Sequence, residues 1–201
     1  MHVLRPALVV TVGLWLLLGL AYPLVTTGVS EVLFPHQAAA SPIVRGDEVV
    51  AAQNVGQNFT AMDQFWGRPS ATLSLTTGKP EPYNAENSGA SNLGPTNPLL
   101  VRQVKAAIAH LRATTPGLRT SQIPPDLVES SGSGLDPDIT AAAAEIQIPR
   151  VARATGLGEA RLRALVRSQV QGPTLGLFGQ AMVNVVDLNL ALDRLLDAQK
   201  R

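Results

Sequence analysis

The densest group of residues able to do chemistry lies between residues 130 and 138. The run Ser130-Ser131-Gly132-Ser133-Gly134 resembles an anion-binding turn, because backbone N–H groups at a helix amino terminus bind phosphate. Asp136 places a carboxylate where phosphate would need a donor, so a structural turn is the favoured interpretation. Asp136 and Asp138 could also form an acid–base pair. Because Asp136-Pro137 is typical of a helix start, we interpret both carboxylates as facing a helix dipole.

Other catalytic groups do not form a recognisable set. The three histidines are widely separated in the sequence, and a surface position is expected for His110 on its helix. No serine lies in a GxSxG motif, and no GxxxxGK[ST] phosphate loop occurs. Chemistry alone therefore favours a non-enzymatic domain with no cofactor of its own.

A charge-free run of twenty-five residues, from Pro6 to Ser30, indicates where this domain is held. A helix of about 20 apolar residues crosses the hydrocarbon core of a bilayer, so the run predicts a transmembrane helix. A cleaved secretory signal, processed near Ala38–Ala40, is the alternative. An uncleaved anchor is favoured, because the apolar core of a signal is usually only about 7–15 residues long.

The charges beside this run predict its orientation. Arg5 precedes it, whereas the first charge after it is the acidic Glu31 and the first basic residue there is Arg45. Basic residues remain on the cytoplasmic side, which places the amino terminus inside. We therefore expect a cytoplasmic tip and transmembrane helix over residues 1–30, a juxtamembrane connector over 31–46, and a soluble extracytoplasmic domain over 47–201.

Composition limits what the soluble part can do. It holds all 15 acidic and all but one of the 16 basic residues, so it is formally neutral and carries no basic surface typical of nucleic-acid binding. The chain has no cysteine, so a packed core rather than disulfides must hold the domain together.

Periodicity and punctuation predict an α+β fold. Strands are expected at 48–52, 70–77 and 181–186. A first helix is expected after the N-cap Asn97. A second should start at Asp136-Pro137, run through the alanine-rich stretch, be interrupted at Pro149 and end at Gly156. Two more are expected over 158–170 and over 188–199, the last with Asp187 as its cap.

Between the second strand and the first soluble helix lies a long segment rich in Gly, Pro and Asn. Loops of about 20 residues are uncommon in compact domains unless they are functional or disordered. Because this loop carries directed hydrogen-bonding groups, we expect an ordered partner interface. Its expected members are Tyr83, Asn84, Ser91, Asn92 and Asn97.

Nine segments, in order along the chain, carry a resemblance to a known family. They are Gly56-Gln57-Asn58-Phe59, Phe65-Trp66-Gly67-Arg68-Pro69-Ser70-Ala71, Tyr83-Asn84-Ala85, Ser88-Gly89-Ala90-Ser91-Asn92-Leu93, Asn97-Pro98, Pro125-Asp126-Leu127-Val128, Ser131-Gly132-Ser133-Gly134-Leu135-Asp136-Pro137, Gln147-Ile148-Pro149-Arg150-Val151-Ala152, and Val183-Asn184-Val185-Val186-Asp187-Leu188-Asn189-Leu190-Ala191-Leu192-Asp193. With them the chain resembles the KdpC family, the C subunits of the bacterial Kdp potassium-transporting ATPase.

The resemblance implies an accessory subunit of a potassium pump in the bacterial inner membrane. Its partners would be a channel-like A subunit, a P-type ATPase B subunit, a small F subunit and the lipid bilayer. The chain lacks the DKTGT aspartate of P-type pumps, so hydrolysis belongs to another subunit. An anchored envelope protein unrelated to transport is the alternative.

The resemblance also implies particular residue roles. Ser131, Gly134, Asp136, Pro137 and Pro149 would be structural. The family is associated with a catalytic chaperone role that raises the ATP affinity of the pump, and Gln147 would be the nucleotide contact. An extracytoplasmic domain conflicts with that role, because ATP is scarce outside the cell. Gln147 could equally satisfy backbone groups beside Pro149, and that interpretation is favoured.

Overall fold

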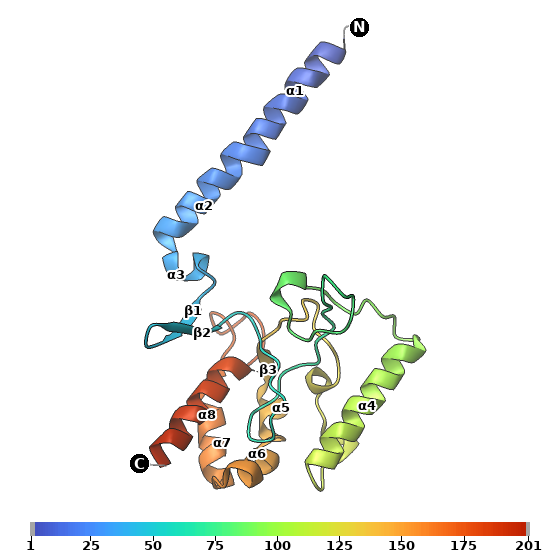
Figure 1. The fold of residues 1–201 in the computed structure, drawn as a ribbon, viewed down its shortest axis with the longest axis vertical. Helices are drawn as coiled ribbons and strands as arrows, with labels where there is room; N and C mark the ends of the chain where they lie inside the picture. The colour runs from blue at the N-terminus through green and yellow to red at the C-terminus, as the bar shows by residue number, and fades with distance from the viewer. Residues whose placement is uncertain (1–2, 200–201) are drawn as a thin grey trace. The chain divides into compact units, whose positions relative to one another are not determined.

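The computed structural model describes residues 3–199, which fall into two compact units divided between Ala52 and Gln53. The first unit is dominated by one apolar helix, Leu4–Leu33, of 30 residues, within which a stretch of 18 residues has a mean hydropathy of 2.2 (Figure 1). It consists of α1 (Leu4–Leu16), a π-helical turn (Leu17–Ala21) and α2 (Tyr22–Leu33). Its length and composition suffice to cross a bilayer, as the charge-free run predicts.

Pro23 gives a reason for the π-helical turn. Proline has no N–H to donate to the carbonyl four residues earlier, here that of Gly19, so the hydrogen-bond ladder must change locally. The helix nevertheless continues past Glu31 to Leu33. The segment expected as a connector thus contains the last turn of α2, the short helix α3 (Pro35–Ala38) and strand β1 (Pro42–Arg45).

Strand β1 pairs with β2 (Glu48–Ala52) in an antiparallel hairpin. Pro42 lies opposite Ala52 and Arg45 opposite Glu48. Gly46 has a φ of +65° at the turn, where the left-handed backbone favours glycine. The predicted strand at 48–52 is confirmed.

The second unit has mixed α+β architecture, as the sequence predicts. Strands β3 (Asp138–Thr140), β5 (Met182–Asn184) and β4 (Val170–Gln171) form an antiparallel sheet in that order. Helices α5 (Ala141–Glu145), α6 (Ile148–Thr155), α7 (Glu159–Ser168) and α8 (Val185–Gln199) pack beside it. The core lies mainly among these elements. Its fully buried members include Phe65, Ile139, Ile148, Val151, Leu162, Val166, Val183, Leu188 and Leu192.

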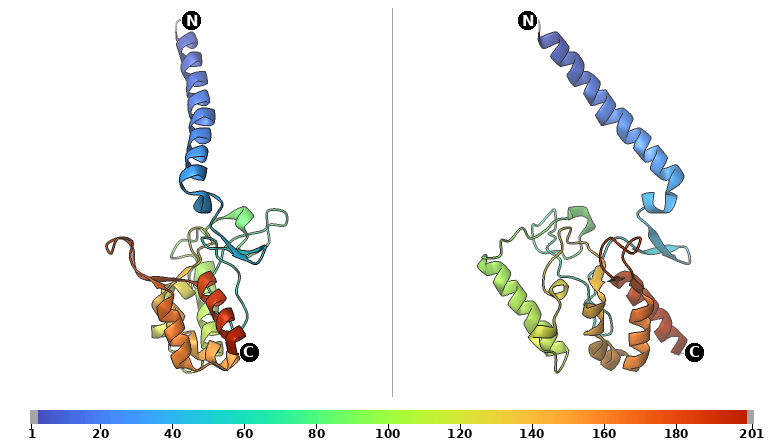
Figure 2. Two further views of the ribbon diagram at one scale, coloured as in Figure 1. Left: turned by 90° about the vertical axis from the view of Figure 1, so that its left-hand side faces the viewer. Right: turned by 180° about the vertical axis from the view of Figure 1, so that it is seen from behind.

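Helix α4 (Pro98–Thr114) lies on the opposite side of this unit from α8 (Figures 1 and 2). The Asn97 side chain accepts a hydrogen bond from the Leu99 N–H at 2.8 Å, so the predicted cap is confirmed. Short 3-10 turns cover Ala85–Asn87, Thr120–Gln122 and Pro125–Leu127. The predicted interruption at Pro149 and the end at Gly156 (φ +74°) are also confirmed.

The prediction of a strand at 70–77 is wrong. Only a single bridge joins Leu73 to Pro80. The alternating hydroxyl residues bind loop backbone instead: the Ser70 hydroxyl accepts from the Tyr83 N–H at 2.9 Å, and the Thr72 hydroxyl donates to the Glu81 carbonyl at 2.6 Å. Side-chain hydrogen bonds of this kind replace a strand ladder.

The helix start expected at Asp136-Pro137 is also wrong, because residues 138–140 form β3. The cap is Thr140, whose hydroxyl accepts from the Ala143 N–H at 3.1 Å. Asp136 and Asp138 therefore do not face a helix dipole from its first turn.

Helix α8 likewise begins earlier than expected. It starts at Val185, directly after the strand predicted at 181–186, which covers only Met182–Asn184. The cap is Asn184, whose Oδ1 accepts from the N–H groups of Val186 and Asp187 at 3.0 and 3.1 Å. Asp187, the expected cap, lies in the first turn instead.

The segment 53–97 is held by side chains rather than by strands. Tyr83, with a φ of +62°, inserts its ring against two glycines. A Cβ on Gly56 would collide with the Tyr83 ring, and one on Gly67 would lie 2.6 Å from the Tyr83 hydroxyl. The hydroxyl itself donates to the Arg68 carbonyl at 2.8 Å. Both glycines are therefore required for close approach.

We expect the substitution Gly56→Ala to lower the free energy of unfolding by about 2 kcal/mol, because the added methyl overpacks the Tyr83 ring. Denaturant unfolding of the full chain in nanodiscs, followed by near-ultraviolet circular dichroism, measures this. Gly94→Ala is the matched control, since its Cβ would meet nothing within 4 Å. Combining Gly56→Ala with Tyr83→Leu should cost less than the sum of the two single changes; strict additivity would contradict the proposed contact.

Candidate functional site

Gln147 lies at the start of α6 and is only 1% exposed. Its Oε1 accepts hydrogen bonds from the Trp66 N–H at 2.8 Å and from Arg150 Nη2 at 2.7 Å. Its Nε2 donates to the carbonyls of Trp66 at 3.0 Å and Ala143 at 3.1 Å. Both amide protons and the amide oxygen are thus engaged within the protein.

Asn189 forms a similar pair of hydrogen bonds with the backbone of Phe65, the residue before Trp66. From the buried face of α8, its Oδ1 accepts from the Phe65 N–H and its Nδ2 donates to the Phe65 carbonyl, both at 2.8 Å. We did not single out Asn189 from the sequence. An available signal was its position on the apolar stripe of α8, beside Val185, Leu188 and Leu192, where a polar side chain needs a buried partner.

Arg150 completes this network and is also 1% exposed. Its Nη1 donates to the Met62 carbonyl at 2.6 Å, and its guanidinium carbon lies 3.7 Å from the centre of the Trp66 ring. Burial lowers the pKa of Arg150 to about 10, so the side chain remains cationic near neutral pH. The Met62 carbonyl, the Gln147 amide oxygen and the Trp66 ring together stabilise the buried guanidinium charge.

An open pocket lies on the outer side of Trp66. It has a volume of about 350 Å³ and is lined by Phe59, Trp66, Arg68, His110, Leu111 and neighbouring residues. The His110 ring stacks on Trp66 with 4.9 Å between the ring centres. His110 is exposed, as expected, yet this contact joins α4 to the Trp66 segment.

The serine- and glycine-rich run forms a turn that satisfies its own amides. The Gly134 N–H donates to the Ser131 hydroxyl at 2.9 Å, and the Leu135 N–H donates to the Ser133 hydroxyl at 3.1 Å. Gly134 has a φ of +68°, and a Cβ there would lie 2.7 Å from the Gly89 carbonyl oxygen. The N–H groups of Gly134 and Leu135 are therefore engaged within the turn and do not point to a bound anion.

The residues after this turn connect it to the rest of the unit. Asp136 forms an ion pair with Arg68 at 3.1 Å, and its other oxygen accepts from the Asp138 N–H. The Pro137 carbonyl accepts from the Val185 N–H at 2.8 Å. Burial, together with the charge of Asp136, raises the pKa of Tyr83 to about 12.

Asp138 lies among acidic neighbours. Burial and the charges of Asp136 and Asp187 raise the pKa of Asp138. Among residues 3–199, no three His, Asp or Glu side chains gather where they could hold a metal ion.

The expected interface residues lie on one loop but differ in their local contacts. Asn84 caps the turn at 85–87 by accepting from the Glu86 N–H, and Asn97 caps α4. The Ser91 hydroxyl accepts from the Leu93 N–H at 3.5 Å, and the Tyr83 ring packs against Gly56 and Gly67. Within this set of five, Asn92 alone has an exposed side-chain amide without a hydrogen bond, on a backbone with a φ of +51°.

Comparison with known proteins identifies the family. The model of the family described as "KdpC: K+-transporting ATPase, c chain" matches residues 4–194. The chain belongs to the KdpC family. It is 54% identical to the potassium-transporting ATPase KdpC subunit of Methylobacterium nodulans over 96% of both chains. The KdpC subunits of Polaromonas naphthalenivorans and Variovorax paradoxus are each 52% identical, over 96% of this chain and 95–96% of theirs.

For this KdpC-family chain, the buried network predicts a structural role for Gln147. We expect Gln147→Leu to lower the free energy of unfolding by about 3 kcal/mol, because it leaves the Trp66 N–H and carbonyl unpaired in the interior. Gln180→Leu is the control, since Gln180 is exposed and surface substitutions usually change stability by about 0.5 kcal/mol or less. Denaturant unfolding without nucleotide measures both; equal stability of the two variants would refute the structural role.

Proposed function

We propose that the chain is the C subunit of a Kdp-type potassium-transporting ATPase. It acts as an accessory subunit that stabilises the assembly of a channel-like A subunit, a P-type ATPase B subunit and a small F subunit. Hydrolysis belongs to the B subunit. The observation that carries this proposal is identity of 50% or more to KdpC subunits over nearly their whole length.

The proposal includes a location and an orientation. The helix Leu4–Leu33 anchors the chain in the bacterial inner membrane, where it packs against the pump. Arg5 keeps the amino terminus in the cytoplasm, which puts the second unit outside the cell. There the domain is placed to cover the entrance for potassium.

The loop from Tyr83 to Asn97 is the proposed contact with the other subunits. Its support is the ordered backbone, which is held by the Tyr83 ring and by the caps at Asn84 and Asn97. Such a loop presents the free amide of Asn92 without paying ordering entropy on assembly.

Co-purification tests this proposal. We expect the tagged full chain to bring down the pump subunits from detergent extracts, and to restore growth at low potassium in cells that lack their own C subunit. Asn92→Gly should reduce recovery of the pump subunits several-fold. Glycine retains the left-handed backbone while removing the amide, so the loss reports the side chain alone.

A matched variant serves as the control. Asn58→Ala removes an exposed asparagine outside the loop, so this variant should assemble normally. Normal recovery with Asn92→Gly would reject the interface assignment. Migration of the tagged chain as a lone monomer would favour instead an anchored envelope protein unrelated to transport.

A second role is that of a catalytic chaperone, which raises the ATP affinity of the B subunit. In its direct form, Gln147 contacts the nucleotide. One observation weighs against this form: the Gln147 amide is buried with all its groups engaged. The proposed orientation, if correct, also separates Gln147 from cytoplasmic ATP. We therefore favour an indirect effect through contacts with the pump.

ATP titration distinguishes the two forms. We expect no saturable ATP binding by the full chain in nanodiscs at millimolar nucleotide. For the assembled pump, omission of the chain should raise the ATP concentration for half-maximal hydrolysis if the chaperone role holds. A purely stabilising subunit would change only the amount of active complex. Saturable ATP binding by the chain alone would support direct contact.

A further inference from the structure

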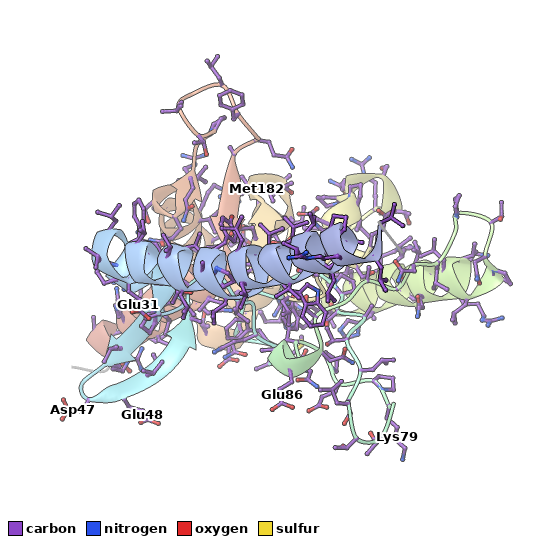
Figure 3. All side chains as sticks on the ribbon, turned by 90° about the horizontal axis from the view of Figure 1, so that it is seen from above. Glu31, Asp47, Glu48, Lys79, Glu86 and Met182 are labelled. Carbon is purple, nitrogen blue, oxygen red and sulfur yellow. The ribbon has the colours of Figure 1, made fainter. Side chains whose placement is uncertain are left out.

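The loop between β4 and β5, residues 172–181, carries an unusual apolar tip. Its large side chains are the three most exposed apolar ones in the described part of the second unit: Leu175 at 84%, Leu177 at 82% and Phe178 at 66%. No charged residue occurs between Arg167 and Asp187. Figures 2 and 3 show the loop, just before the labelled Met182, extending away from the rest of this unit.

The tip is a preformed turn. The N–H groups of Thr174 and Phe178 donate to each other's carbonyls at 2.8 and 3.0 Å, and the Leu177 N–H donates to the Thr174 carbonyl at 3.2 Å. Leu175 has a φ of +56°, a conformation that non-glycine residues rarely adopt. Residues held in such sparsely populated conformations cluster at functional sites.

The composition of the tip distinguishes between possible partners. Energetically dominant residues at protein interfaces are enriched in Trp, Tyr and Arg, and leucine is under-represented among them. The tip has none of the three enriched types and no charge to pair. Segments that lie in the membrane interface insert Leu and Phe. Because several N–H groups are already paired within the turn, entering an apolar phase leaves fewer of them unsatisfied.

A lipid surface is also the partner most available to the loop. The same chain carries the apolar helix Leu4–Leu33, and residues 34–52 tether the second unit to it. Tethering converts a weak contact with the bilayer into an intramolecular one at high effective concentration. We propose that Leu175, Leu177 and Phe178 insert into the headgroup–acyl boundary of the membrane in which this helix is anchored.

Site-directed fluorescence tests the insertion. Because the chain has no cysteine, Leu177→Cys gives a single site for an environment-sensitive label. The control is Leu75→Cys, a leucine that is 63% exposed on a different loop of the same unit. The full chain is placed in nanodiscs of phosphatidylethanolamine and phosphatidylglycerol that contain lipid spin-labelled near the glycerol end. Near-ultraviolet circular dichroism checks the fold, and Leu175→Cys serves as a second labelling site.

We expect the label at residue 177 to emit at shorter wavelength and to be quenched several-fold more strongly than the label at residue 75. Adding Phe178→Ser should reduce that quenching. Equal emission and quenching at both sites would overturn the proposal. A shift that appears only after the pump subunits are added would overturn it as well, because it would show that the tip docks on protein rather than lipid.

Discussion

Two buried side-chain amides hold the centre of the soluble unit together. Gln147 pairs with both backbone groups of Trp66, and Asn189 pairs with both backbone groups of Phe65. Each amide thus replaces a neighbouring strand for one residue. This matters because the chain from Gln53 to Asn97 has little regular structure, and buried backbone groups without partners are costly. Helices α6 and α8 therefore position a loop that could not pair its own backbone.

Contacts of the residues that follow Phe65 and Trp66 connect this buried network to the expected interface loop. Arg68, two residues later, pairs with Asp136 and offers its carbonyl to the Tyr83 hydroxyl. The Tyr83 ring in turn fills the space left by Gly56 and Gly67. The position of the loop that contains Asn92 is consequently linked, through side-chain contacts, to the packing of α6 and α8. Substitution of Gln147 or Asn189 should therefore alter the position of the loop that contains Asn92, although neither side chain contacts that loop.

Several helix boundaries and the long apolar helix were predicted correctly from the sequence. Asn97 caps α4, Pro149 interrupts the alanine-rich helix, Gly156 ends α6, and the charge-free run forms one long helix. Two of the errors arise where a side chain bonds to residues far away in the sequence. Ser70 and Thr72 alternate like strand residues but bind the loop at 81–84, and Asp136 pairs with Arg68 instead of starting a helix. Asn189 could not be assigned because its partner, Phe65, lies 124 positions away.

The same network clarifies why separate segments identify the family. The segments around Phe65, Gln147 and Asn189 are far apart in the chain, yet all three meet in one set of hydrogen bonds. Each alone is a short and common pattern. Together they specify a buried arrangement that needs an amide at Gln147, a guanidinium at Arg150 and an aromatic ring at Trp66. The presence of Gln147 is thus accounted for by folding, and a nucleotide that reached its amide would have to compete with Trp66 for the same donors and acceptor.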